Sequence, residues 1–221
     1  MPPFRVATSD TIRNMTVSQS RSISGPTFEP DDAADVLATL RLLDAMGLLP
    51  LKTPLERLDL ATLRRAARAA SAAGIGRDAT TLLRDGAGDP ATVRRVVAQL
   101  REALEDSPVP RSEIRELLGV FDPDALGALV GASASSLRRY ALGARATPDD
   151  VAARIHWLAK VVGDLRGAYN DAGVKRWFER RRVQLDDRPP RALLLGAWDP
   201  EDDGPRAVRG LARALSGGGA T

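Results

Sequence analysis

Apolar side chains recur at three- and four-residue steps along most of this sequence, which is the spacing of one face of an α-helix. From Asp31 to about Gly47 that face carries Val36, Leu37, Leu40, Leu43 and Met46. From Pro90 to Glu105 a continuous stripe is formed by Val93, Val96, Val97, Leu100 and Leu104, and Asp89 stands at the expected N-cap. The pattern predicts an all-α fold.

The remaining start and stop signals predict further helices. Thr53, Pro54 and Glu56 form a capping box that favours a helix from Thr53 to Ala73, closed by Gly74. We expect other helices over residues 77–84 and 112–120, and a long one from Pro148 to Tyr169. On that long helix His156 has no partner at metal-ligand spacing, so we interpret it as structural.

Two prolines in the stretch Asp106 to Pro110 interrupt any helix and mark the best domain boundary. The predicted division is an arm over residues 1–30, a helical N-terminal domain over 31–106, a unit over 111–172, a small helical domain over 173–216 and a tail over 217–221. The arm is either mobile or orders on DNA or a partner. The N-terminal domain serves either dimerisation or the binding of a second partner.

Residues 126–148 are the most informative stretch. Gly127 is a small residue where two helices would cross, Gly131 stands at the turn between them, and Ser133 is the N-cap of the second helix. The apolar anchors of both helices keep helical spacing: Leu126, Leu129, Val130, Ala132, Leu137 and Tyr140. This arrangement predicts a DNA-binding helix-turn-helix.

The predicted second helix, from Ser133 to Ala141, would enter the major groove. Its outer face carries Ser135, Ser136, Arg138 and Arg139, whose hydroxyls and guanidiniums suit phosphate and guanine. Arg145 follows in the next loop, where it would hold the DNA backbone. With Ser133, these residues are the predicted contacts to double-stranded DNA.

The segment LGALVGASASSLRRYALGARATP, which ends with Gly143, Arg145, Thr147 and Pro148, resembles the Xre-type, lambda-repressor-like helix-turn-helix. The resemblance implies a fold of that type, with flanking helical domains. The alternative is a plain helical hairpin inside an all-α core.

Residues 112–215 together resemble the Xre/MbcA/ParS antitoxins, in which a small toxin-binding domain follows the helix-turn-helix. The elements that carry this second resemblance are Val174, Trp177 and Phe178; Leu185; Pro190, Leu193 and Leu194; and a closing helix with Val208, Leu211 and Leu215. It implies a RES-domain toxin as partner, bound through Trp177, Arg180, Arg181, Leu185 and Leu194. Residues 180–184 replace the Pro-Asn-Pro that usually precedes the middle leucine, and the N-terminal domain lies outside the usual short antitoxin.

Trp177 and Phe178 are at the same time the simplest core anchor of this terminal domain. The cluster Lys175, Arg176, Arg180, Arg181 and Arg182 has three interpretations. It is a solvated helix face, a contact to DNA phosphate, or a partner for an acidic surface.

Composition narrows the function classes. Hydrophobic residues make up 43% and charged residues 28% of the 221, which is typical of a globular chain, and the net charge of +3 is weak support for nucleic-acid binding. The absence of cysteine excludes disulfides, thiolate metal sites and cysteine nucleophiles. No signal peptide and no apolar run of roughly 20 residues is present, so we expect a cytoplasmic protein with no membrane contact.

Catalytic motifs are missing: there is one histidine with no nucleophile motif near it, and no phosphate-binding loop of the G-x-x-x-x-G-K-[ST] type. We therefore expect no enzymatic activity, no metal and no cofactor. The sequence predicts a homodimeric DNA-binding antitoxin that represses its own operon and neutralises a RES-type toxin. The alternatives are a stand-alone regulator or phage-type repressor, and a protein-binding scaffold without DNA affinity.

Overall fold

The structure is a computed structural model that describes residues 28, 30–49, 58–85 and 89–217. Throughout these residues the regular secondary structure is helical, apart from one isolated antiparallel bridge between Arg182 and Arg188. The predicted all-α class is therefore confirmed. The predicted arm, except for its last residues, and nearly all of the predicted tail lie outside the described residues, as do Thr53, Pro54 and Glu56.

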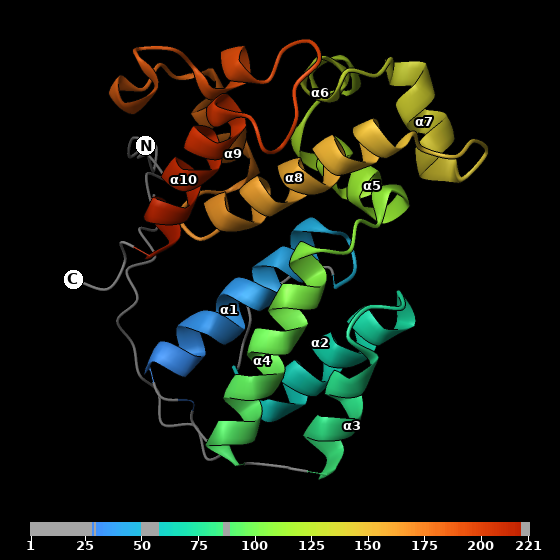
Figure 1. Cartoon of the computed structure of the whole chain (residues 1–221), viewed down its shortest axis with the longest axis vertical. Helices are drawn as coiled ribbons and strands as arrows, with labels where there is room; N and C mark the ends of the chain where they lie inside the picture. The colour runs from blue at the N-terminus through green and yellow to red at the C-terminus, as the bar shows by residue number, and fades with distance from the viewer. Residues whose placement is uncertain (1–27, 29, 50–57, 86–88, 218–221) are drawn as a thin grey trace, which may run out of the picture.

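Four helices form the first half of the fold, in the lower part of Figure 1: α1 (Pro30–Ala45), α2 (Leu60–Ala72), α3 (Arg77–Asp85) and α4 (Pro90–Glu105). Their facing apolar stripes make one core, which includes Leu40, Leu63, Leu83 and Leu100, all nearly inaccessible to solvent. As predicted, Asp89 caps α4 by accepting a hydrogen bond from the Thr92 amide.

The second half contains α5 (Pro110–Val120), α6 (Pro123–Val130), α7 (Ala134–Leu142), α8 (Asp149–Leu165), α9 (Asp171–Glu179) and α10 (Asp203–Gly217), with two short 3-10 turns over Val183–Leu185 and Pro190–Leu193. The central helix is α8, which crosses the upper part of Figure 1. A second core surrounds α8 and includes Ile114, Leu126, Leu158 and Trp177.

The two cores meet where α1 packs against α8. Gly163 of α8 permits this close approach, because a Cβ there would lie 3.3 Å from Cα of Leu42 and 3.4 Å from the Arg41 carbonyl. Ala45 of α1 belongs to the second core and Ala159 of α8 to the first. The chain thus changes core at the predicted proline-rich linker, while α1 contacts both halves.

A buried polar pair lies beside this junction. Glu113 of α5 is fully buried, and its Oε1 lies 2.6 Å from Nδ1 of His156. The other ring nitrogen of His156 lies 2.8 Å from the carbonyl oxygen of Glu105, at the end of α4. Burial raises the pKa of Glu113. The histidine thus finds an acidic partner 43 residues away in sequence, beyond any local spacing.

Several helix ends differ from the predictions, and the following differences have a local cause. The helix predicted from Thr53 to Ala73 begins only at Leu60, because Asp59 is its N-cap and accepts a hydrogen bond from the Thr62 amide. The long helix ends at Leu165 instead of Tyr169, since i→i+3 bonds such as Ala168 N–H to Leu165 O tighten the chain there. Helix α5 begins at Pro110 instead of Ser112, because proline has no amide hydrogen to lose at a first helical position.

Candidate nucleic-acid interface

Helices α6 and α7 are joined by the three-residue turn 131–133, and each predicted turn residue has a physical role. Gly131 has φ of +73°, in the left-handed region that glycine adopts with least strain. The Ser133 hydroxyl accepts a hydrogen bond from the Ser136 amide at 3.1 Å and so caps α7. Gly127 lies against the turn, because a Cβ there would stand 2.3 Å from the Ala132 carbonyl oxygen.

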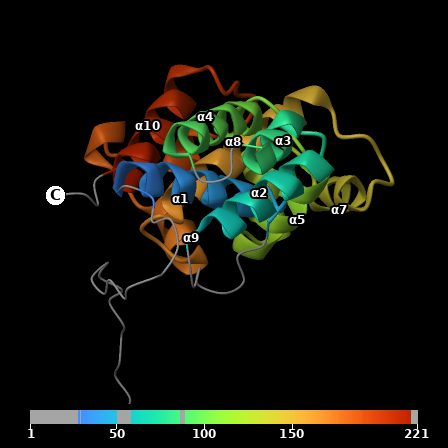
Figure 2. The ribbon, with the colours of Figure 1, turned by 90° about the horizontal axis from the view of Figure 1, so that it is seen from below.

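The apolar anchors predicted for this pair are buried, with Ala132 half-buried: Leu126, Leu129, Val130, Leu137 and Tyr140. They place α6 against α8 and α7 against α5. The opposite side of α7 remains in solvent. In both views α7 and the loop after it lie at the edge of the molecule (Figures 1 and 2).

The outer face of α7 carries the predicted contact residues. Ser135, Arg138 and Arg139 are exposed and Ser136 is half-buried. Arg145, in the following loop, is exposed and has its guanidinium carbon 5.9 Å from the centroid of the Tyr140 ring. Within the described part of the chain, none of the three arginines forms an ion pair. Their charges are free to meet an external anion.

The hydroxyl groups of the three serines lie within hydrogen-bonding distance of one another. The Ser133 hydroxyl lies 3.1 Å from that of Ser135 and donates to that of Ser136 at 3.0 Å. The main role of Ser133 is therefore to cap α7, because its hydroxyl is already hydrogen-bonded there. Ser135, more exposed, is better placed for an external acceptor.

The sequence did not predict the two side chains that donate hydrogen bonds to the carbonyls just before the turn. Nη1 of Arg154 donates to the Val130 carbonyl at 3.3 Å, and its Nε donates to the Trp198 carbonyl at 2.7 Å. The indole of Trp198 donates to the Leu129 carbonyl at 2.8 Å. The last carbonyls of α6 are thus satisfied by side chains from distant segments. Trp198 lies 69 residues from Leu129, so no local signal could have found this support.

The loop after α7 is held in a similar way. Gly143 closes α7 with φ of +73°, and Nη2 of Arg111 donates to the Leu142 carbonyl at 3.0 Å. A Cβ on Gly143 would lie 2.9 Å from the guanidinium carbon of Arg111. Arg111 of α5 therefore fixes the start of the loop that carries Arg145.

The five predicted partner-binding residues separate into two groups. Trp177, Leu185 and Leu194 are buried, with at most 3% of each exposed, and they form core. They present almost no surface in this structure, and the expectation that they bind a partner stays a prediction. Arg180 and Arg181 are exposed and remain accessible.

The wider cationic cluster is also divided by the fold. Lys175 pairs with Asp122 at 2.9 Å, and Arg182 stacks on the Trp177 ring with its guanidinium carbon 5.2 Å from the centroid. Arg176 is exposed. In the closing helix α10, Val208 and Ala212 are fully buried while 38% of Leu215 is exposed.

Comparisons with known proteins add no relative: no family model matches the chain, and neither the curated proteins nor the solved structures contain a significant match. Among the helices of the described residues, none has both the length and the apolar character needed to cross a bilayer.

Proposed function

We propose that this chain binds double-stranded DNA through a lambda-repressor-like helix-turn-helix made of α6 and α7. The observation that carries the proposal is the exposed face of α7, where Arg138 and Arg139 have no ion-pair partner within the described residues and stand on a helix fixed by a glycine turn and a serine cap. Arginine reads guanine edges with two hydrogen bonds and also binds phosphate. In this proposal Arg145 contacts the DNA backbone.

The test compares two pairs of arginine substitutions in the full-length protein. A bound duplex is first selected from a random-sequence pool, and its affinity is then measured by fluorescence anisotropy. Arg138→Ala with Arg139→Ala is expected to lower that affinity about a hundredfold, since each base contact by arginine is worth about 1–3 kcal/mol. Circular dichroism is expected to show unchanged folding, because both side chains are exposed.

Arg65→Ala with Arg95→Ala is the matched control, because it removes the same charge from exposed positions on α2 and α4. We expect it to change the affinity by no more than a small factor. An equal loss of affinity in both double variants would mean that binding depends only on net positive charge. An unchanged affinity in the α7 variant would refute the assignment.

We further propose that the protein is a homodimeric, cytoplasmic antitoxin that represses its own operon and neutralises a RES-type toxin. This step rests on the resemblance of residues 112–215 to the Xre/MbcA/ParS antitoxins. Arg180 and Arg181 are its accessible partner-binding residues. The alternative is a stand-alone regulator without a toxin partner.

A truncation after Gly173 would not separate these functions, because it removes Trp177 and Phe178 from the core. The sharper experiment purifies tagged protein from its native host, as wild type and as Arg180→Glu with Arg181→Glu. A stoichiometric protein partner that is lost only in the variant would support the antitoxin. Enrichment of discrete DNA sites with no protein partner would support the stand-alone regulator.

A further inference from the structure

A cavity of about 340 Å³ lies along the hairpin formed by α2 and α3, far from α7 in sequence. It is lined by Arg64, Arg68, Thr80, Leu83 and Arg84. Arg64 and Arg68 are four residues apart on α2, and Thr80 and Arg84 are four apart on α3, so each pair occupies one face of its helix. The two helices pack side by side at the lower right of Figure 1. Three guanidiniums therefore converge on one cavity.

These three cations have no anionic partner among the described residues. Arg64 donates through Nε and Nη2 to the Leu83 carbonyl at 3.3 and 3.2 Å. Within the described residues, the hydrogen bond that Arg84 forms is a long one of 3.5 Å to the hydroxyl of Thr81. Like charges gathered at one place repel one another, and a bound anion would remove that repulsion.

Thr80 supplies an independent observation. Its hydroxyl oxygen is inaccessible to solvent and has no hydrogen-bond partner among the residues that the structure describes. A buried hydroxyl without a partner destabilises a fold, so such a group calls for an explanation. Rotation about the Cα–Cβ bond of Thr80 would bring this hydroxyl to an oxyanion in the cavity, which would supply the missing acceptor.

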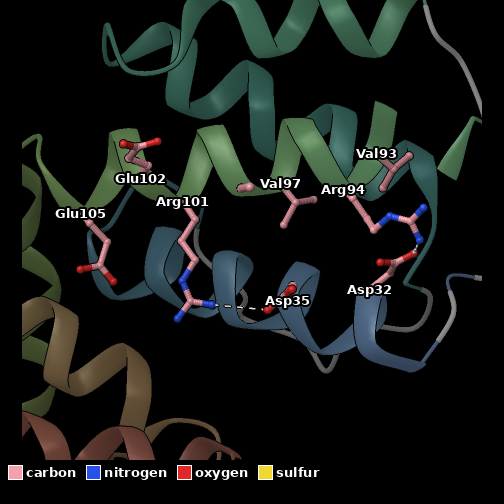
Figure 3. Close-up of a pocket in the computed structure, with 9 residues that line it drawn as sticks. Asp32, Asp35, Val93, Arg94, Val97, Arg101, Glu102 and Glu105 are labelled. Carbon is pink, nitrogen blue, oxygen red and sulfur yellow. Dashed lines mark hydrogen bonds and ion pairs between the residues drawn. The ribbon is translucent and has the colours of Figure 1, made fainter. Parts of the chain in front are cut away.

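A larger groove between α1 and α4 differs from the α2–α3 cavity in the charges that line it. It has a volume of about 500 Å³ and its lining includes both acids and arginines. Arg94 pairs with Asp32 at 3.4 Å and Arg101 with Asp35 at 3.7 Å, so its cations face acids of its own (Figure 3). The charged residues that line the α2–α3 cavity are all cations, which distinguishes it as a site for an external anion.

We propose that the α2–α3 cavity binds a phosphate group. Guanidinium N–H groups match phosphate oxygens in geometry and charge, and the Thr80 hydroxyl adds a neutral donor. The phosphate belongs either to a small phosphorylated molecule or to a nucleic-acid backbone. Both sources present the same chemistry to the cavity.

The first arm of the test measures binding of inorganic phosphate and pyrophosphate to the full-length protein by isothermal titration calorimetry, at constant ionic strength. Arg68→Gln with Arg84→Gln is expected to raise the dissociation constant about tenfold or more, because hydrogen bonds to charged groups are the stronger class. Arg65→Gln, an exposed arginine of α2 that does not line the cavity, is the control and is expected to leave it unchanged.

Thr80→Val separates binding from folding, since valine keeps the shape of threonine without its hydroxyl. We expect this variant to weaken phosphate binding while its melting temperature without phosphate stays equal to that of the wild type or rises. A merely structural hydroxyl would instead lower the melting temperature and leave phosphate affinity unchanged, an outcome that counts against the site.

The second arm repeats the comparison with the duplex selected for α7. If the Arg68/Arg84 variant binds all duplexes more weakly and with a shallower salt dependence, the phosphate belongs to a nucleic-acid backbone. If duplex binding is unchanged while inorganic phosphate binding falls, the ligand is a small phosphorylated molecule. If the cavity variants match Arg65→Gln for phosphate, pyrophosphate and duplex alike, the proposal is overturned.

Discussion

At the scale of single residues, two glycines within helices have opposite roles. Gly127 of α6 is buried, and a Cβ there would lie 2.3 Å from a backbone oxygen of the turn, which cannot move without the turn itself. A Cβ on Gly210 of α10 would meet nothing within 4 Å among the described residues, apart from its chain neighbours and the backbone of its own helix. The first glycine is required by packing, and the second only lowers the helix propensity of α10.

We therefore predict that Gly127→Ala destabilises the protein by about 2 kcal/mol, the cost of forcing an extra carbon into a packed site. Guanidinium denaturation followed by circular dichroism would measure it. In the same assay Gly210→Ala is expected to stabilise by up to about 1 kcal/mol, because alanine is the better helix former. Equal shifts of the same sign would show that the α6–turn contact is not tight.

Residues that act within a few positions of their partners were predictable from sequence. Gly131 and Ser133 act on the turn and helix beside them, and both were placed correctly. Arg154 and Trp198 hold the same turn from 24 and 69 residues away, and a single sequence contains no signal for such distances. The burial of Leu185 and Leu194 was missed for the same reason, since the core they enter draws its residues from all the helices from α5 to α10.

At the scale of helices, the periodicity of apolar residues predicted which segments are helical better than it predicted where each helix begins and ends. The start of α2 illustrates why. Both Thr53 and Asp59 are good N-cap residues followed by helix-forming sequence. Local preference cannot choose between them, and in the structure Asp59 caps the helix. Local sequence alone therefore does not decide where a helix with two start signals begins.

The role of Asp59 gives a prediction at this scale. Asp59→Ala is expected to cost about 1 kcal/mol of unfolding free energy, because the Thr62 amide loses its acceptor at the end of the helix. Asp59→Asn keeps an acceptor oxygen and is expected to retain most of that stability. Urea titration at neutral pH would compare the two. If both variants lose the same amount, the charge of Asp59, and not its capping bond, is what stabilises α2.

At the scale of the whole molecule, Glu105 at the end of α4 joins helices from both halves. Its carbonyl accepts hydrogen bonds from Nε2 of His156 at 2.8 Å and from Lys160 at 3.0 Å, both on α8. Its carboxylate accepts hydrogen bonds from Arg209 and Arg213 of α10. The sequence indicates a division into domains at the proline-rich linker that follows Glu105. It does not indicate this junction, because the residues that form it are scattered over more than 100 positions.

The charge of Glu105 makes the junction sensitive to acid. Burial alone would raise the pKa of Glu105, but the hydrogen bond from Arg209 and the surrounding cations hold it below its usual value. A carboxyl whose pKa is lower in the folded than in the unfolded state stabilises the fold above its ordinary value of about 4.3. That stabilisation is lost as the pH falls through the lower folded-state value. Acid therefore weakens the attachment of α10 to α4.

We predict that Glu105→Gln lowers the unfolding free energy by about 2 kcal/mol at pH 7, because Arg209 loses its carboxylate beside Lys160 and Arg213 keeps only the longer pair with Asp164 at 3.9 Å. Amide hydrogen exchange is expected to quicken in α10 before it quickens in α4. The stability difference between wild type and variant should shrink as the pH falls below about 4, where protonation removes the same charge.

The matched control is Glu201→Gln, which removes a carboxylate that pairs with Arg206 on the exposed surface of the same region. Exposed ion pairs contribute about 0.5 kcal/mol or less, so we expect almost no change in stability or in exchange. If Glu105→Gln behaves like this control, its carboxylate is not what holds the two halves together, and the contact of α1 with α8 and the hydrogen bonds to the Glu105 carbonyl are sufficient. If it loosens α10 selectively, a single carboxylate couples the helical N-terminal half to the C-terminal helix. A partner bound near Arg180 and a ligand bound to the N-terminal half would then contact parts of the molecule that are joined through Glu105.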